Sequence, residues 1–177
     1  MKMLLHICCG PCASGAIPWW QVNADHVVGF FYNPNIQPYL EYRRRLTGAR
    51  EVCQLTGIDL AVDEAYDPAA WFGAVLAVDV TRCRACIGLR LERAAAEAAT
   101  QKCDAFSTTL SISPWQDHEA IEAEGQRAGD IYGVDFLYRD LRPIYEETRR
   151  ASREWGIYRQ KYCGCIVSEW ERFRGRS

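Results

Sequence analysis

Short apolar runs alternate with longer stretches of helical periodicity along this chain. The runs MLLHIC at 3–8 and HVVGFFY at 26–32 are apolar almost throughout, which is typical of strands buried on both faces of a sheet. The expected strands are 3–8, 26–32, 58–64, 104–110 and a weaker 134–138. The periodicity between and after them predicts helices at about 13–22, 38–56, 68–78, 87–102, 117–129, 146–160 and 164–173.

This βαβαβ order indicates a parallel sheet covered by helices on both faces, a Rossmann-like α/β fold. No repeat, low-complexity segment or long linker separates a second unit, so we expect one domain over 1–177. Ligands of such sheets bind beyond the carboxyl ends of the strands. The loops that should converge there are CCGPC after the first strand, NPNIQP after the second and TLSISPWQD after the fourth.

Composition and charge narrow the possible partners. The 177 residues are 49% hydrophobic and 25% charged, which suits a globular domain with a real core. No run approaches the roughly 20 apolar residues of a membrane span, so no membrane partner is expected. The net charge is -2, but residues 139–177 carry ten of the 21 basic residues against six acids. This basic segment and Arg43–Arg45 could face a phosphate backbone, although a solvated helix face is the plainer interpretation.

Nine cysteines are the most unusual feature of the composition. The odd number argues against a closed disulfide framework, and a cytoplasmic location is expected for such a chain. Cys53 and Cys103 stand alone on helix positions and are expected to pack in the core. The other seven form three motifs: Cys8, Cys9 and Cys12 in CCGPC, Cys83 and Cys86 in RCRAC, and Cys163 and Cys165 in YCGC.

The spacing of these seven thiols favours metal binding over packing or thiol–disulfide chemistry. Each motif is predicted at the start of a helix, where the helix dipole stabilises thiolates. Thiolates without harder ligands favour zinc or an iron–sulfur cluster. Four thiols can hold a 4Fe-4S cluster, and three would leave an open position on a second metal, as in catalytic sites.

Five motifs together resemble the cobalamin-independent epoxyqueuosine reductases, the QueH family. They are HICCGPC at 6–12, YNPNI at 32–36, RCRACIGLRL at 82–91, FSTTLSISPWQD at 106–117 and YCGCIVS at 162–168. The resemblance implies a single Rossmann-like (HUP-like) metal-binding domain with its site at the C-terminal ends of the strands. It also implies an oxidoreductase that reduces epoxyqueuosine at the tRNA wobble position to queuosine. The implied cofactors are a 4Fe-4S cluster and an adjacent mononuclear iron, and the implied partners are tRNA carrying epoxyqueuosine and an external electron donor.

The same resemblance assigns the metal ligands. Six cysteines fall on the family's metal-binding positions, namely Cys8, Cys9, Cys83, Cys86, Cys163 and Cys165. Relatives can carry aspartate in place of Cys12, and both residue types bind iron. As a working division, we place Cys8, Cys9, Cys83 and Cys86 on the cluster and Cys12, Cys163 and Cys165 on the lone iron. Adjacent Cys8 and Cys9 would point to opposite sides if both belong to a strand, so the two metals could exchange a ligand.

The reaction also needs protons and a nucleoside pocket. Removing the epoxide oxygen takes two electrons and two protons, and the candidate proton donors are Tyr32, Tyr162 and Asp117 with its neighbour His118. Packing for the tyrosines and helix capping for Asp117 are the alternatives. His6 is expected to be a satisfied buried imidazole. The candidate substrate-binding residues are Asn33, Asn35, Thr108, Thr109, Ser111, Ser113 and Trp115.

Three other functions remain open from the residues. A tRNA thiolation enzyme of the ATP-pyrophosphatase kind should carry an SGGxDS-type loop after the first strand, where CCGPCAS stands. A thiol–disulfide oxidoreductase would use one CxxC and leave five thiols unexplained. A non-catalytic zinc-binding module would be colourless, whereas iron–sulfur protein is brown.

Overall fold

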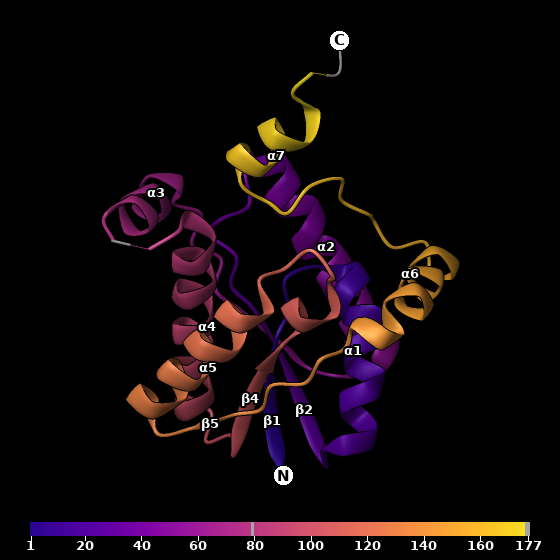
Figure 1. Ribbon diagram of the computed structural model, residues 1–177. Coiled ribbons are helices and arrows are strands. Elements are labelled where there is room, and N and C mark those ends of the chain that lie inside the picture. The colour runs from indigo at the N-terminus through magenta and orange to yellow at the C-terminus, as the bar shows by residue number, and fades with distance from the viewer. Residues whose placement is uncertain (79, 176–177) are drawn as a thin grey trace.

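The fold is built on a five-stranded parallel sheet in the order β3-β2-β1-β4-β5. A computed structural model describes residues 1–78 and 80–175 (Figure 1). The strands are β1 (Lys2–His6), β2 (His26–Phe31), β3 (Leu60–Val62), β4 (Ala105–Thr108) and β5 (Asp135–Phe136). The predicted Rossmann-like α/β fold is confirmed, with all five expected strands present but shorter than predicted.

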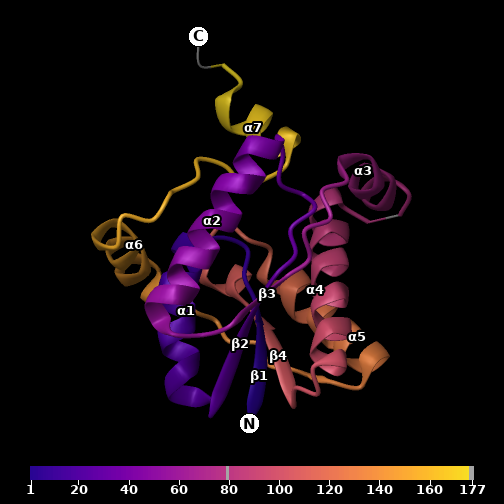
Figure 2. The same cartoon turned by 180° about the vertical axis from the view of Figure 1, so that it is seen from behind.

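Helices cover both faces of this sheet. They are α1 (Gly10–Asn23), α2 (Tyr39–Thr56), α3 (Pro68–Leu76), α4 (Arg82–Thr100), α5 (His118–Tyr132), α6 (Tyr145–Glu154) and α7 (Ile166–Phe173), with short 3-10 helices η1 (Thr109–Ile112) and η2 (Arg142–Ile144). Figures 1 and 2 show α1, α2 and α6 on one side of the sheet and α4 and α5 on the other. Helices α3 and α7 lie at the end opposite the N-terminus, beyond the carboxyl ends of the strands. Within the described ranges, every helix is too short or too polar to cross a membrane.

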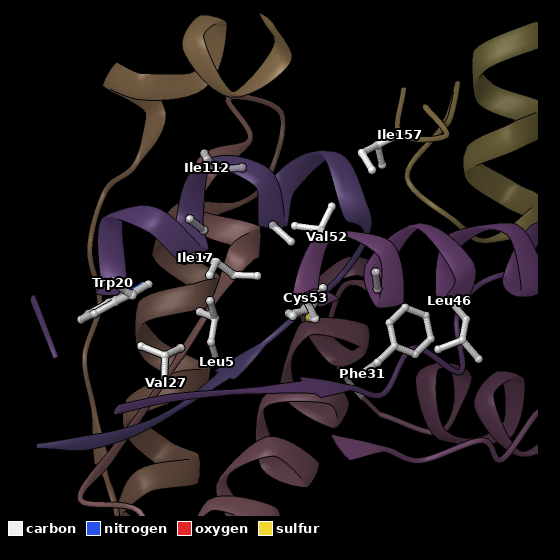
Figure 3. Packing of buried hydrophobic residues seen from close by; sticks show 14 of the residues in the cluster. Leu5, Ile17, Trp20, Val27, Phe31, Leu46, Val52, Cys53, Ile112 and Ile157 are labelled. Atoms are coloured by element: carbon white, nitrogen blue, oxygen red, sulfur yellow. The ribbon is translucent and has the colours of Figure 1, made fainter. Parts of the chain in front are cut away.

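Two apolar cores hold these layers together. Successive side chains of a strand point to opposite faces, so Leu5 packs with α1 and α2 whereas Leu4 packs with α4 and α5. Figure 3 shows the first core, in which Cys53 is one of the buried residues. Cys103 is buried in the second core, so the prediction that these two cysteines pack is confirmed. The packed layers fix the end of β1, which Cys8, Cys9 and Cys12 follow.

Several predicted boundaries are wrong, and the earlier starts of α1 and α4 place Cys12, Cys83 and Cys86 inside helices. Strand β1 ends at His6 and α1 begins at Gly10, which leaves Cys8 outside the strand. Helix α4 starts at Arg82 rather than about 87, because the Thr81 side chain accepts a hydrogen bond from the Arg84 amide and caps it. Helix α6 ends at Glu154 rather than 160, followed closely by Gly156 in the left-handed region with φ 67°.

Candidate metal centre

Three thiols gather directly after β1. Cys9 is the residue before α1, Cys12 lies in its first turn, and Cys8 precedes both. Their Sγ atoms all lie within 4.8 Å of one another, and those of Cys8 and Cys9 are 3.7 Å apart. The expectation that Cys8 and Cys9 diverge does not apply, because the strand ends before them. Among the described residues, this trio is the one group of three or more potential ligands already so close.

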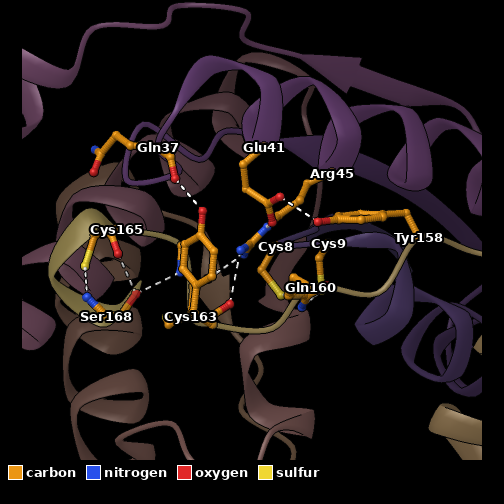
Figure 4. A network of polar contacts seen from close by, with 12 residues as sticks. Cys8, Cys9, Gln37, Glu41, Arg45, Tyr158, Gln160, Cys163, Cys165 and Ser168 are labelled. Carbon is orange, nitrogen blue, oxygen red and sulfur yellow. Dashed lines mark hydrogen bonds and ion pairs between the residues drawn. The ribbon is translucent and has the colours of Figure 1, made fainter. Parts of the chain in front are cut away.

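Polar groups from distant segments surround the trio. The Thr109 hydroxyl lies 3.2 Å from the Cys8 sulfur and 3.0 Å from the Cys8 amide nitrogen, which donates to it. The Gln160 amide nitrogen donates to the Cys9 sulfur at 3.0 Å (Figure 4). Hydrogen bonds with Cys12 and then Cys8 hold the pKa of Cys9 well below its usual value. Cys9 is therefore the thiol in the trio that ionises first.

The remaining four thiols come from the start of α4 and the loop before α7. Cys86 and Cys165 are buried beside Trp71 and Val75 in a small apolar cluster, whereas Cys83 and Cys163 are exposed. Burial is the main cause that raises the pKa of Cys86, and the nearby charges of Cys163 and Cys165 raise it further. The RCRAC and YCGC motifs, far apart in sequence, therefore lie close enough for their charges to interact.

A buried ion pair on α2 supports the YCGC loop. Arg45 Nε donates to Glu41 Oε1 at 2.7 Å, and the same guanidinium donates to the backbone carbonyls of Tyr162 and Cys163 (Figure 4). The other Glu41 oxygen accepts from the Tyr158 hydroxyl at 2.6 Å. The expectation that Arg45 faces phosphate is wrong, because this side chain is only 2% exposed.

Gln37, which follows β2, hydrogen-bonds to the YCGC loop and to the start of α7. Its carbonyl accepts from the Tyr162 hydroxyl at 2.6 Å, and its side-chain oxygen accepts from the Ile166 amide at 3.1 Å. A Cβ placed on Gly164 would lie 2.6 Å from the Asn35 side-chain nitrogen, so the loop approaches Asn35 more closely than any larger residue allows. The cysteines on either side of Gly164 are thus held at fixed positions.

The structure separates the three predicted proton donors. Asp117 Oδ1 accepts from the Ala120 amide at 2.9 Å and caps α5, and the Tyr162 hydroxyl is already bonded to Gln37. Burial first, then the charge of Glu41, raises the pKa of Tyr162 to about 12. Tyr32 is half-buried, burial raises its pKa, and its hydroxyl has no hydrogen-bond partner among the described residues. Of the three candidates, Tyr32 is therefore the one whose acidic group makes no such bond.

The ring nitrogens of His6 and His118 already have hydrogen-bond partners. The predicted satisfied His6 is confirmed, since its ring nitrogens lie 2.9 Å from Thr108 Oγ1 and 3.2 Å from the Tyr32 carbonyl. His118, considered with Asp117, lies 2.7 Å from the Tyr138 hydroxyl and 2.9 Å from the Ser113 carbonyl.

The predicted substrate-binding residues divide into a buried and an exposed group. Asn33 and Asn35 are buried, and their Oδ1 atoms have no partner within the described residues. The Asn33 amide nitrogen donates to the Ile7 carbonyl at 2.8 Å, which ties it to the loop that begins the cysteine trio. The other buried candidates are Thr108, Thr109 and Ser111.

Trp115 is the exposed member of the set. It follows Ser113, is 76% exposed and packs edge-on against Tyr145, with ring centroids 5.3 Å apart. Its indole therefore borders α6, the helix that begins at Tyr145.

Sequence reasoning did not identify the contacts that four residues make in this region. Glu41 and Arg45 carried a signal, because glutamate four residues before arginine on a helix is a favourable pair. Gln160 had none, since 151 positions separate it from Cys9. Arg90, buried on α4 behind Cys86, lies inside the RCRACIGLRL motif without having been assigned a role.

The fold and the gathered thiols define an α/β domain that can bind a metal group at the carboxyl edge of its parallel sheet. The family model described as "Epoxyqueuosine reductase QueH" matches residues 3–171. This chain belongs to that family, and the family predicted from the motifs is confirmed.

Relatives named epoxyqueuosine reductase QueH match nearly end to end. The protein from Dehalococcoides mccartyi is 38% identical over 172 residues, which cover 97% of this chain and 94% of that protein. The protein from Thermotoga maritima is 37% identical over 179 residues, covering 96% of this chain and 91% of its own length.

Two solved structures share the fold at low sequence identity. The U34-tRNA thiolase NcsA of Methanococcus maripaludis, with its 4Fe-4S cluster, superposes with a TM-score of 0.56 at 13% identity. That match covers 95% of this chain and 61% of the thiolase chain. A predicted subunit of tRNA methyltransferase from Methanocaldococcus jannaschii gives a TM-score of 0.51 at 13% identity and covers 88% of each chain.

Proposed function

We propose that this protein is an oxidoreductase that deoxygenates epoxyqueuosine in tRNA to queuosine. The observation that carries the proposal is the meeting of Cys8, Cys9 and Cys12 within 4.8 Å, in a chain that matches the epoxyqueuosine reductase family from residue 3 to residue 171. A phosphate-binding loop of the thiolation enzymes would have to occupy the same place after β1, and CCGPC stands there instead.

The seven thiols suit iron as the metal. Thiolate ligands without carboxylates favour iron–sulfur clusters or zinc, and seven exceed the four ligands of one structural zinc. We propose a 4Fe-4S cluster on four of them and a mononuclear iron on the other three. When bound, the cluster would pass single electrons and the lone iron would act as a Lewis acid.

Two divisions of the thiols are compatible with this proposal. In the working division made from the sequence, Cys8, Cys9, Cys83 and Cys86 hold the cluster and Cys12, Cys163 and Cys165 hold the lone iron. The closeness of Cys8, Cys9 and Cys12 supports a second division, in which these three share one metal group and the other four thiols share the other.

The chain's own residues would bind the nucleoside and move the proton. The unpartnered amide oxygens of Asn33 and Asn35 can accept hydrogen bonds from nucleoside hydroxyl or amino groups. Tyr32, whose phenol is protonated at neutral pH, is the proposed proton donor. Trp115 is exposed and can stack on a base.

The proposed reaction also requires a surface that binds tRNA and a source of electrons. The proposed contacts to tRNA phosphates lie on or after α6, the helix whose first residue packs against Trp115, and they are Arg149, Arg150, Arg153 and Arg159. We place the protein in the cytoplasm, and an external donor would deliver the two electrons that each turnover consumes.

Incubation with epoxyqueuosine-containing tRNA and a reductant tests the function. The reconstituted protein should contain about five irons, four for the cluster and one more. Nucleoside mass analysis should show loss of one oxygen from epoxyqueuosine. An unchanged nucleoside, or colourless protein loaded with zinc, would contradict the proposal.

A Cys163→Ser variant separates the two divisions of thiols. If the working division holds, the cluster absorption is retained and turnover is lost with the lone iron. If Cys163 belongs to a cluster held by Cys83, Cys86 and Cys165, the cluster absorption disappears as well. Cys53→Ala is the control, because this thiol lies in the apolar core and should keep all the iron.

A further inference from the structure

Arg90 is a buried cation on the helix that carries two of the metal-site thiols. It follows Cys83 by seven residues and Cys86 by four, spacings that place all three on one face of α4. Its side chain lies in the interior at 3% exposure, and Nε donates to the Cys86 carbonyl at 3.1 Å. Within the described part of the chain, no carboxylate lies within 4.0 Å of its nitrogens, in contrast to buried Arg45 with Glu41.

A charge in such a position needs an anionic partner, because an uncompensated ion in the interior costs several kcal/mol. Thiols from all three motifs lie near enough for their charges to act on Arg90. Burial alone would lower the pKa of Arg90, but the negative charges of Cys86, Cys163, Cys8 and Cys83 raise it overall.

His6 is a second buried residue on which the charge of Arg90 acts. Burial is the main cause that lowers the pKa of His6 to about 3, and the charge of Arg90 lowers it further. His6 ends β1, directly before the cysteine trio. Arg90 therefore lies close enough to both the strand end and the start of α4 for its charge to act on each.

We propose that Arg90 is the counter-cation of the metal centre, placed to offset the negative charge of the metal-bound thiolates. The proposal rests on the cluster of the proposed function. A cluster held by thiolates is anionic in both oxidation states and more so after reduction, so a fixed cation favours the reduced form and raises the reduction potential. Arg90 is a positioning and charge-balancing residue and does not touch the substrate.

Arg90→Met, Arg90→Lys and the control Arg127→Met test this role in the full-length reconstituted protein. Arg127 is a surface arginine of α5 paired with Glu124 and Glu92. Redox titration followed by electron paramagnetic resonance should give a more negative cluster potential for Arg90→Met. Arg90→Lys, which keeps the charge, should remain closer to the native potential, and Arg127→Met should match it.

The metal-free protein provides a second measurement. With no metal to keep the thiols ionised, Arg90 has little anionic charge to balance, so Arg90→Met should unfold at the same or higher urea concentration than the native chain. A residue needed only for packing would lower the midpoint in both forms.

Three results would overturn the proposal: an unchanged cluster potential in Arg90→Met, a clearly lower urea midpoint for its metal-free form, or equal cluster loss from Arg90→Met and Arg90→Lys. Cluster loss from Arg90→Met with retention in Arg90→Lys supports it. Because none of these readouts needs epoxyqueuosine, a chain that keeps its cluster but leaves the nucleoside unchanged would defeat the proposed function and leave the role of Arg90 standing.

Discussion

Arg45 and Glu41 form a buried ion pair one helical turn apart on α2, and Arg45 also binds the backbone of the YCGC loop (Figure 4). Both partners lie in the interior, with 2% and 7% of their side chains exposed. The charge of one is balanced by the other, and the spare guanidinium nitrogens fix the carbonyls of Tyr162 and Cys163. The pair thus joins a helix near the start of the fold to the YCGC loop near its end.

Replacing Arg45 with methionine should destabilise the protein by about 3–5 kcal/mol, because Glu41 is left as an unpaired buried charge. Urea unfolding of the metal-free protein measures this. The Glu41→Leu, Arg45→Met double variant should lose less than the sum of the two single variants. Arg43→Gln, an exposed change on the same helix, should stay within about 0.5 kcal/mol. Equal effects of Arg43→Gln and Arg45→Met would contradict the role of the pair.

Gly164→Ala should displace the YCGC loop, because the new Cβ would lie 2.6 Å from the Asn35 side-chain nitrogen and 3.3 Å from Ile36 Cγ1. We expect lower iron content at nearly unchanged helical circular dichroism. Gly73→Ala is the matched control, since a Cβ there meets nothing within 4 Å and alanine favours a helix by roughly 0.5–1 kcal/mol over glycine. Full iron occupancy in Gly164→Ala would show that the loop tolerates the added carbon.

The sheet and the cysteine motifs could be predicted because their signals are local. The apolar run 26–32 became β2 (His26–Phe31), and CCGPC follows β1 as expected. The start of α4 was missed although Thr81, a common capping residue, marks it. The spacing of apolar residues shows that a helix is present but not at which turn it begins. The capping residue marks that boundary.

Residues that act through tertiary contacts could not be found in the same way. Arg43, Arg44 and Arg45 are three consecutive residues of the same type, so the sequence does not distinguish them. Arg45 is the one that is buried, because of the side of α2 that faces the rest of the fold. The partner of Cys9, Gln160, lies on the segment after α6, a helix that packs on α1. The cysteine motifs are readable from their spacing, whereas the groups that hold them in place are not.

Alkylation mapped by mass spectrometry should sort the thiols by function. In metal-free protein the exposed Cys83 and Cys163 should react, whereas Cys53 should not, because burial raises its pKa to about 12. Loading with iron and sulfide should protect Cys83 and Cys163, and a chelator should restore their reactivity. Cys53 serves as the internal control in every state. Equal labelling of Cys163 with and without metal would remove it from the ligand set.

The basic face of α6 should govern binding of tRNA. Arg150 and Arg153 are exposed and have no ion-pair partner among the residues described, and α6 begins at Tyr145, which packs against Trp115. Substituting both with glutamine should weaken binding of all tRNAs alike and reduce the slope of log affinity against log salt by about 1 per arginine.

Filter binding at several salt concentrations measures that slope, and turnover at saturating tRNA should stay near the native rate because neither side chain borders the thiols. Arg50→Gln, which removes an exposed arginine paired with Glu64 at the far end of α2, is the matched control and should leave the slope unchanged. If the α6 variant and the control bind tRNA equally well at every salt concentration, the phosphates contact another surface. An unchanged affinity with a lowered turnover would instead place these arginines in the reaction itself.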